Sequence, residues 1–175
     1  MLRIREAAAR LSAEPVSIHN AIRVEAAGAD SARAVIDRIE PFHKGGAERG
    51  LINGGILQAL LERAMRAAAA AAFEAGPTRL VSLDQRWLGP VLPRGVAALA
   101  RIEGRAGDGV VMVHAEISDA RGGPRVAAAG IVIHTGAATV PPTGVSLTGA
   151  PDPPEPQAGA CAPVPRPSRL RGRPP

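Results

Sequence analysis

Aromatic residues are nearly absent from this 175-residue chain, which has one Trp, two Phe and no Tyr. Its hydrophobic residues, 46% of the total, are therefore mostly aliphatic or Ala, so a core must form by close backbone packing rather than around large side chains. The length fits one domain with appendages. Because such a core buries little surface per residue, oligomerisation would add stability.

Cysteine is also scarce, because Cys161 is the only one and lies in a proline-rich stretch. A single cysteine excludes a disulfide framework, and His114 and His134 have no Cys or further His at ligand spacing. We therefore predict a cytoplasmic protein that has no metal site and needs no cofactor.

Long hydrophobic runs are missing too, since no apolar run approaches the roughly 18 residues that span a bilayer. The most apolar segment, residues 54–75, contains Glu62, Arg63 and Arg66. The N-terminus carries Arg3 and Arg5 but no apolar segment before a cleavage site. We expect no targeting peptide and no membrane partner.

Acidic residues are outnumbered by basic ones, 16 to 21, which gives a net charge of +5 and a pI of about 11.1. Four of the arginines lie in the last ten residues, and the chain has a single lysine. The high pI therefore mostly reflects the high pKa of Arg. Nucleic-acid binding through the Arg-rich end, Arg166 to Arg173, is kept only as a minor alternative to a solvated tail.

Breaker residues divide the chain into an ordered middle and two appendages. Apolar residues at three-to-four spacing predict a short, loosely packed helix before Pro15. A strand is predicted within residues 34–42, ending at Pro41. A long helix begins after Asn53 and runs to the breaker Gly76-Pro77. Four strands follow, at residues 80–88, 95–103, 109–118 and 125–134.

This order of elements predicts an α+β fold in which an antiparallel sheet, with hairpin connections between its last four strands, wraps around the long helix. We divide the chain into an N-terminal extension (1–31), one domain (32–137) and a proline-rich disordered tail (138–175). One half of the helix is apolar and faces the core. The opposite half carries the polar residues Gln58, Glu62, Arg63 and Arg66.

The start of the helix carries a spaced motif, in which Asn53 precedes the pair Gly54-Gly55 and Glu62 follows. This pattern resembles the signature of hotdog-fold acyl-CoA thioesterases of the phenylacetate-degradation (PaaI) type, G-x-x-H-G-G followed by six residues and Asp. The segment Arg86-Trp87-Leu88-Gly89-Pro90 is similar to the family's aromatic-Leu-x-Pro strand end. The resemblance covers about residues 32–136. It implies a hotdog fold, hydrolysis of acyl-CoA, and a site at the interface of a homodimer, often within a tetramer.

Physical reasoning about the same residues supports this chemistry. Uncovered N–H groups at a glycine-rich helix start can stabilise a carbonyl oxygen that becomes negative, so Gly54 and Gly55 are the oxyanion-hole candidates. Glu62 is the candidate general base or nucleophile, and Asn53 is the candidate orienting group. Eight residues at 1.5 Å each separate Gly54 from Glu62 by roughly 12 Å. A working site would therefore combine Gly54 of one subunit with Glu62 of another.

Four positions depart from the family pattern: Asn53 stands for its His, Glu62 for its Asp, Ala47 for an upstream Asn and Leu80 for a Ser or Thr. These departures keep open a catalytically weak or inactive module that binds acyl-CoA or a protein partner. Simpler roles also stay open. Asn53 can be an N-cap with or without substrate contact, Glu62 can be the (i, i+4) ion-pair partner of Arg66, and the glycines can serve close packing.

Several other residues carry weaker predictions. His43 is expected to be a loop histidine without a fixed role, and Phe73 and Trp87 are expected to belong to the core. Three arginines are candidates, on charge alone, for contacts with CoA phosphates: Arg79, Arg86 and Arg94.

Overall fold

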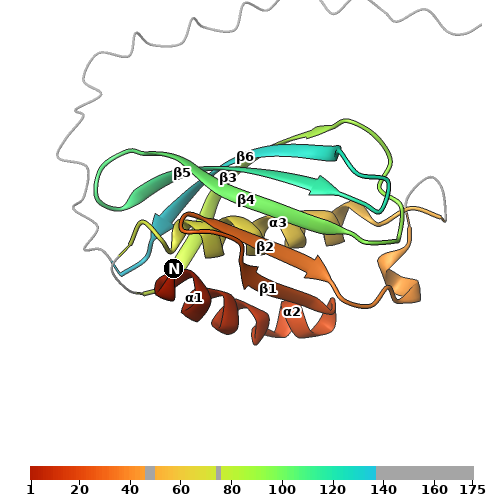
Figure 1. Ribbon diagram of the computed structural model, residues 1–175, viewed down its shortest axis with the longest axis horizontal. Coiled ribbons are helices and arrows are strands. Elements are labelled where there is room, and N and C mark those ends of the chain that lie inside the picture. Colours follow the sequence, from red (N-terminus) through yellow and green to blue (C-terminus); the bar gives the residue numbers. More distant parts are fainter. Residues whose placement is uncertain (46–49, 74–75, 137–175) are drawn as a thin grey trace, which may run out of the picture. The chain divides into compact units, whose positions relative to one another are not determined.

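The computed structural model describes residues 1–45, 50–73 and 76–136, and these belong to one compact unit (Figure 1). Ala47, Cys161 and the predicted tail, 138–175, lie outside the described residues. The elements in chain order are α1 (Leu2–Ser12), α2 (Pro15–His19), β1 (Ile22–Ala26), β2 (Ser31–Ile36), a 3-10 turn η1 (Pro41–His43), α3 (Gly54–Ala69), β3 (Thr78–Trp87), β4 (Ala97–Arg105), β5 (Val110–Ser118) and β6 (Pro124–His134).

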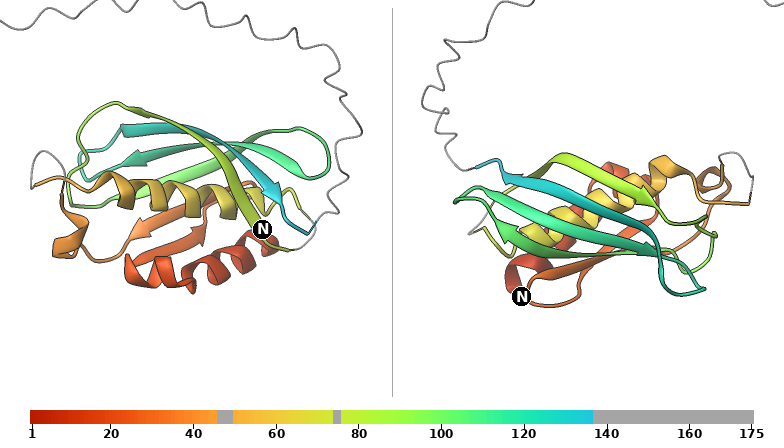
Figure 2. Two further views of the ribbon diagram at one scale, coloured as in Figure 1. Left: turned by 180° about the vertical axis from the view of Figure 1, so that it is seen from behind. Right: turned by 90° about the horizontal axis from the view of Figure 1, so that it is seen from above.

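The six strands form one antiparallel sheet in the order β1-β2-β4-β5-β6-β3. The sheet curls around α3, which runs along its inner face (Figures 1 and 2). The predicted α+β architecture, an antiparallel sheet around a central helix, is confirmed. One predicted hairpin is wrong, because β3 pairs with β6 instead of β4 and so lies at an edge of the sheet.

Small residues bring the sheet close to the helix. Strands β2, β4 and β5 pack against α3, and their completely buried residues include Ala98, Ala100 and Ala115. On β6, a Cβ atom added at Gly130 would lie 2.8 Å from Sδ of Met65, so the methionine packs directly on that backbone. Close backbone packing thus takes the place of large aromatic side chains.

Helix α1 is part of the core. Its apolar stripe of Ile4, Ala8 and Leu11 is buried in the same cluster as α3, and α1 packs against β1 and α3. The expectation of a loosely packed helix is therefore wrong. The sequence did not predict β1, which pairs with β2 along its whole length, and β2 begins at Ser31, before the predicted strand.

Helix α3 is shorter than predicted, because it ends at Ala69. Alanine favours helix, but beyond Ala70 the chain turns and buries Phe73, whose ring stacks on His134 of β6 with centroids 5.2 Å apart. Arg3 of α1 donates a hydrogen bond to the Phe73 carbonyl at 3.0 Å. Tertiary packing overrides helix propensity here, and the predicted core role of Phe73 is confirmed.

Candidate active site

Asn53 closes the first turn of α3. Its backbone is extended, and its Oδ1 accepts a hydrogen bond from the N–H of Gly55 at 2.8 Å. Its own N–H donates to the carbonyl of His43 at 2.8 Å. The predicted N-cap is therefore confirmed. The amide of Gly55, one of the two oxyanion-hole candidates, is already engaged by this cap.

Gly54 differs from Gly55, because its N–H has no acceptor among the residues that the structure describes. The indole of Trp87, at the end of β3, lies beside it, since a Cβ atom on Gly54 would be 3.5 Å from the ring. Trp87 is 53% exposed, so the prediction that it is a core residue is wrong. Gly54 thus combines an available helix-terminal N–H with a neighbouring exposed aromatic ring.

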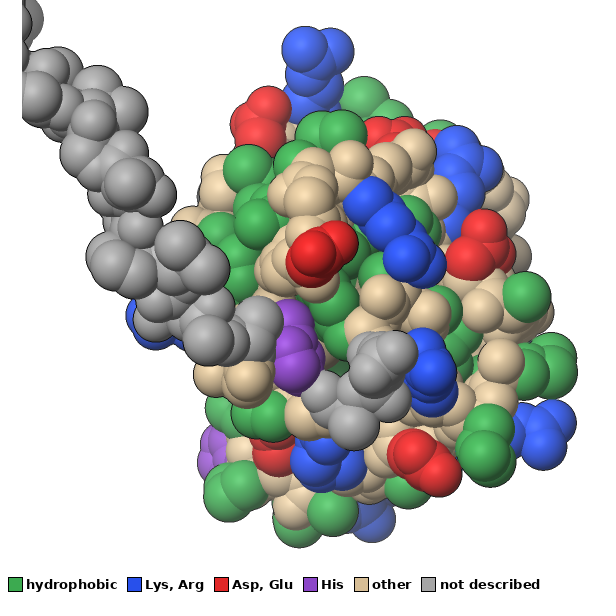
Figure 3. Space-filling model, turned by 90° about the vertical axis from the view of Figure 1, so that its left-hand side faces the viewer, with side chains coloured by type: hydrophobic (Ala, Val, Ile, Leu, Met, Phe, Trp, Pro, Cys, Tyr) green, Lys and Arg blue, Asp and Glu red, His purple; other side chains and the backbone are tan. Residues whose placement is uncertain are grey.

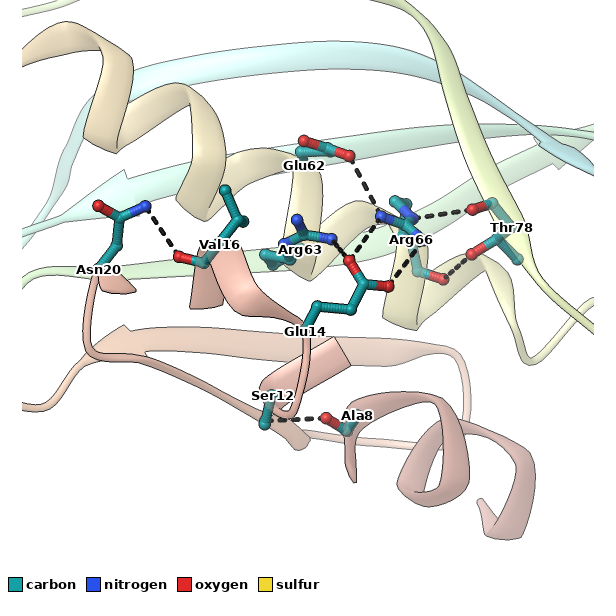
Figure 4. Close-up of polar contacts among 9 residues, drawn as sticks. All are labelled: Ala8, Ser12, Glu14, Val16, Asn20, Glu62, Arg63, Arg66 and Thr78. Atoms are coloured by element: carbon teal, nitrogen blue, oxygen red, sulfur yellow. Dashed lines mark hydrogen bonds and ion pairs between the residues drawn. The ribbon is translucent and has the colours of Figure 1, made fainter. Parts of the chain in front are cut away.

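Glu62 lies two turns along α3, half-buried in an open groove of about 430 Å³ between the helix and β3. The groove is lined by Gln58, Glu62, Leu80, Val81, Ser82 and Leu83. Arg66 Nη1 donates to Glu62 Oε1 at 3.3 Å, which confirms the predicted (i, i+4) pair. The other carboxylate oxygen of Glu62 has no partner within the described ranges and is directed away from Arg66 (Figure 4).

The N-terminal segment covers Arg63 and Arg66, two of the polar residues of α3. Glu14, the residue before α2, accepts hydrogen bonds from Arg66 Nη2 at 3.2 Å and from Arg63 Nη1 (Figure 4). Arg66 Nε also donates to the carbonyl of Thr78 at 2.8 Å. The Arg63 side chain is only 6% exposed. The helical pattern that placed Arg63 on the side away from the core is therefore corrected: Arg63 is buried against the α1–α2 connection.

The two halves of the predicted site lie at separate places in one chain. Gly54 and Glu62 are eight residues apart on one helix, roughly 12 Å, and one wall of the Glu62 groove is the edge strand β3. An edge strand leaves a row of backbone N–H and C=O groups unpaired. β3 is ten residues long and exposes Val81 and Trp87, features typical of an association surface.

The three arginines considered for CoA phosphates are all exposed. Arg86 faces away from α3 and, with Asp84 and His114, lines a hollow of about 280 Å³ on the outer face of the sheet. The structure therefore does not bring Arg86 together with Gly54 and Glu62.

His43 has a fixed role that the sequence did not predict. It is completely buried, its Nδ1 accepts a hydrogen bond from the N–H of Glu40 at 2.8 Å, and its ring packs on Phe42 with centroids 4.3 Å apart. Burial lowers the pKa of the imidazole below its usual value. Because the His43 carbonyl holds Asn53, the expectation of a loop histidine without a role is wrong.

Asp119, between β5 and β6, is a second residue that the sequence reasoning missed. Its buried carboxylate accepts hydrogen bonds from the N–H of Leu92 at 2.9 Å and of Arg121 at 3.0 Å. Hydrogen bonds from the Arg121 side chain hold the pKa of Asp119 well below its usual range. The adjacent Val91 carbonyl accepts from Ile52, so Asp119 supports the start of α3. The sequence does carry a signal for this turn: Asp119 lies two residues before Arg121, whose N–H it accepts, and Gly122-Gly123 follow.

Other kinds of site find little support in the part of the chain that the structure describes. There, no group of three or more His, Cys, Asp or Glu is placed to hold a metal ion. No described helix is both long and apolar enough to cross a membrane. On the face drawn in Figure 3, basic and acidic side chains are interspersed. The Arg-rich end, Arg166 to Arg173, to which the nucleic-acid alternative refers, lies outside the described residues.

Solved structures of known proteins share this architecture. The chain is similar to the E. coli PaaI protein from the phenylacetic acid degradation operon, with a TM-score of 0.61 and 13% identity over 76% of this chain and 96% of that one. It is also similar to a phenylacetic acid degradation-related protein from Ralstonia eutropha JMP134, with a TM-score of 0.60 and 19% identity over 73% of this chain and 98% of that one. A third similar structure, of a protein described as belonging to the thioesterase superfamily, has a TM-score of 0.63 and 19% identity over 74% of this chain and 97% of that one. No protein-family model and no curated protein matches the sequence.

The protein therefore has the hotdog fold that these solved structures share. The resemblance to proteins of the PaaI type, predicted from the helix-start motif, is confirmed at the level of the fold.

Proposed function

We propose that the protein is a cytoplasmic thioester hydrolase that acts on acyl-CoA, with active sites shared between two copies of the chain. The observation that carries this proposal is the half-buried carboxylate of Glu62 beside the groove. Arg66 holds one of its oxygens, and the other has no partner among the described residues. The fold shared with thioesterase-superfamily proteins supports the class of reaction.

In the proposed reaction, water attacks the thioester carbonyl carbon and Glu62 accepts a proton from that water. The N–H of Gly54 from the other subunit stabilises the negative charge that develops on the carbonyl oxygen. Cleavage of the C–S bond then releases a carboxylic acid and CoA, whose sulfur takes up the proton. Alternatively, Glu62 attacks the carbonyl carbon itself, the C–S bond breaks and CoA leaves as a thiolate that takes up a proton. Water then hydrolyses the resulting anhydride to the carboxylic acid and regenerates Glu62. Asn53 orients the substrate through Nδ2, the part of its amide that the cap does not use.

A two-fold dimer is the assembly that accounts for a shared site. If two copies pair along their β3 edges, two-fold symmetry runs their α3 helices in opposite directions. The first turn of one helix then approaches the middle of the other. Pairing would also satisfy the free backbone groups of β3 and cover the exposed Val81 and Trp87. The dimer can stand alone or form half of a tetramer.

Thiol release from a panel of short-chain, medium-chain and aryl acyl-CoAs tests the activity. We expect wild type to hydrolyse at least one of them. Glu62→Gln, which keeps the side-chain size but removes the charge, should lower kcat by about 10²- to 10⁴-fold. Glu25→Gln, on the exposed side of β1, is the control. Full activity of Glu62→Gln would exclude Glu62 as base or nucleophile.

Mixing two inactive variants tests whether the site is shared. Glu62→Gln removes the acid and Gly54→Pro removes the N–H donor, so each homodimer has two damaged sites. After subunit exchange, half of the dimers are mixed and each contains one intact site, so about a quarter of wild-type activity should return. Verified exchange without recovery would mean that each chain carries its own complete site.

A second candidate is a module that binds acyl-CoA or a protein partner without turnover. The closed cap favours it, because Asn53, which stands where the related family has His, engages the N–H of Gly55 with its Oδ1. Calorimetry would then detect binding of a CoA ester while no thiol is released. Trp87, the only Trp, lies beside Gly54, so its fluorescence gives a second readout of binding there.

A further inference from the structure

Glu14 joins four charged side chains in one cluster (Figure 4). It accepts hydrogen bonds from Arg63 and Arg66, and Arg66 also donates to Glu62. Two glutamates and two arginines give the cluster no net charge. Side-chain exposure rises from 6% for Arg63 and 14% for Arg66 to 29% for Glu14 and 36% for Glu62. The cations are therefore withdrawn from water, and Glu62 is the member that solvent and ligands reach most readily.

Arg66 divides its guanidinium among three acceptors. Its Nη2 donates to Glu14 Oε1 at 3.2 Å, and its Nε donates to the carbonyl of Thr78 at 2.8 Å. Its Nη1 lies between two carboxylates, 3.3 Å from Glu62 Oε1 and 3.4 Å from Glu14 Oε2. Because the same nitrogen is shared, Glu62 receives one long hydrogen bond. Glu14 thus limits how tightly Arg66 holds Glu62.

Arg63 strengthens this dependence on Glu14. Glu14 is its one carboxylate partner among the described residues, and its Nε is buried without a hydrogen-bond partner there. If Glu14 were neutral, two largely buried cations would share Glu62 as the only anion of the cluster. A carboxylate held by a complete guanidinium fork has its lone pairs engaged, so it is a poorer base and a poorer nucleophile.

We propose that Glu14 is a positioning residue for Glu62. By engaging Arg63 and Arg66 from the α1–α2 connection, it leaves Glu62 with one contact among the described residues and with its second oxygen unpaired by them beside the groove. This inference rests on the proposed hydrolase function, and it gives the N-terminal segment a part in the active site as well as in the core.

The first test is the kinetics of Glu14→Gln. We expect kcat to fall about tenfold, a fraction of what a general base supplies, while KM changes little because Glu14 does not touch substrate. The matched control is Glu25→Gln. Glu25 also pairs with two arginines, Arg23 and Arg33, but on the exposed surface of the sheet. It should keep wild-type kcat and KM.

Charge repair separates positioning from folding. The double variant Glu14→Gln/Arg63→Met removes one anion together with one cation and puts an apolar side chain at the buried position. It should regain most of the kcat lost in Glu14→Gln, although it has lost more native contacts. All rates are corrected for the folded fraction, measured by circular dichroism. A double variant that is less active than Glu14→Gln would mean that Glu14 acts through folding alone, and would overturn the proposal.

Failure of this inference is distinct from failure of the proposed function. If wild type hydrolyses no thioester, the hydrolase proposal and the role of Glu14 both fall. If wild type and Glu25→Gln are active and Glu14→Gln keeps the wild-type kcat, or loses activity only through KM, the hydrolase proposal stands and the role of Glu14 is overturned.

Discussion

The start of α3 and its middle hold their polar groups in different ways. At the start, Asn53 and Gly55 satisfy each other two residues apart, so the cap follows from local sequence. In the middle, Glu62 and Arg66 are neighbours on the helix, but the remaining contacts of Arg66 come from distant segments, through Glu14 and Thr78. The proposed site therefore joins a locally specified donor to an acid whose surroundings depend on the tertiary structure.

At the start of the helix, a large effect is expected from Gly54→Pro. Proline is well tolerated at the first helical position, and Asn53 already has the extended backbone, with φ −62° and ψ 136°, that a residue before proline prefers. Only the N–H donor is lost, so folding should persist while kcat falls about 10²- to 10³-fold. The matched control is Gly55→Ala. Because the Gly55 N–H already donates to Asn53, this variant should keep most activity. Equal losses in the two variants would contradict Gly54 as the donor.

Asp119→Asn changes the loop that supports this helix start, and its expected effect is on stability. Loss of the buried charge beside Arg121 should cost about 3 kcal/mol of unfolding free energy at pH 7. The folded-state pKa of Asp119 is depressed below its usual 3.8. The stabilisation is therefore present above about pH 4 and is lost as the pH falls further. Urea unfolding should show a smaller difference between variant and wild type at pH 3; a constant difference would exclude the ion pair as its cause.

Val81→Lys changes the strand beside the middle of the helix, and we expect it to have a smaller effect, on dimer association and activity. Val81 is 50% exposed on β3, and lysine on an edge strand opposes pairing with another chain. The variant should sediment as a weaker dimer and lose about tenfold in activity at fixed protein concentration. Leu99→Lys, equally exposed on the central strand β4, is the control. A fully active monomer would contradict the shared site.

The smallest effect is expected from the cap itself. Asn53→Ala should lower the free energy of unfolding by about 1 kcal/mol. Asn53→Asp keeps the capping oxygen but removes the Nδ2 donor, so it should preserve stability and lower kcat. Thermal melts and thiol release measure the two effects separately. If Asn53→Asp has wild-type kcat, the role of Asn53 ends at the cap.

Local patterns in the sequence predicted much of the fold. The Asn-Gly-Gly start, the apolar stripe of the central helix and the strands at residues 80–88, 95–103, 109–118 and 125–134 correspond to α3 and to β3–β6. The Glu62–Arg66 pair also followed from helical spacing. These features depend on residues close in sequence, which is why periodicity and capping rules find them.

Features that depend on distant contacts were missed or misread. The helical pattern cannot reveal that Glu14 covers Arg63, nor that Phe73 leaves the helix to stack on His134. The exposure of Trp87 follows from the edge position of β3, which the pairing of β3 with β6 decides. The bond from the Leu92 N–H to Asp119 also joins distant segments. By contrast, the contact of His43 with Glu40 and the turn at Asp119 are local, and the sequence reasoning overlooked them.

The sequence by itself determined a small-residue core, a capped central helix, an antiparallel sheet and a carboxylate placed two turns beyond a glycine pair, because each of these is set by local spacing and composition. The tertiary structure alone decided which strand lies at the edge and which cations surround Glu62. These depend on segments that meet only when the chain folds, and burial then determines which charges must be paired.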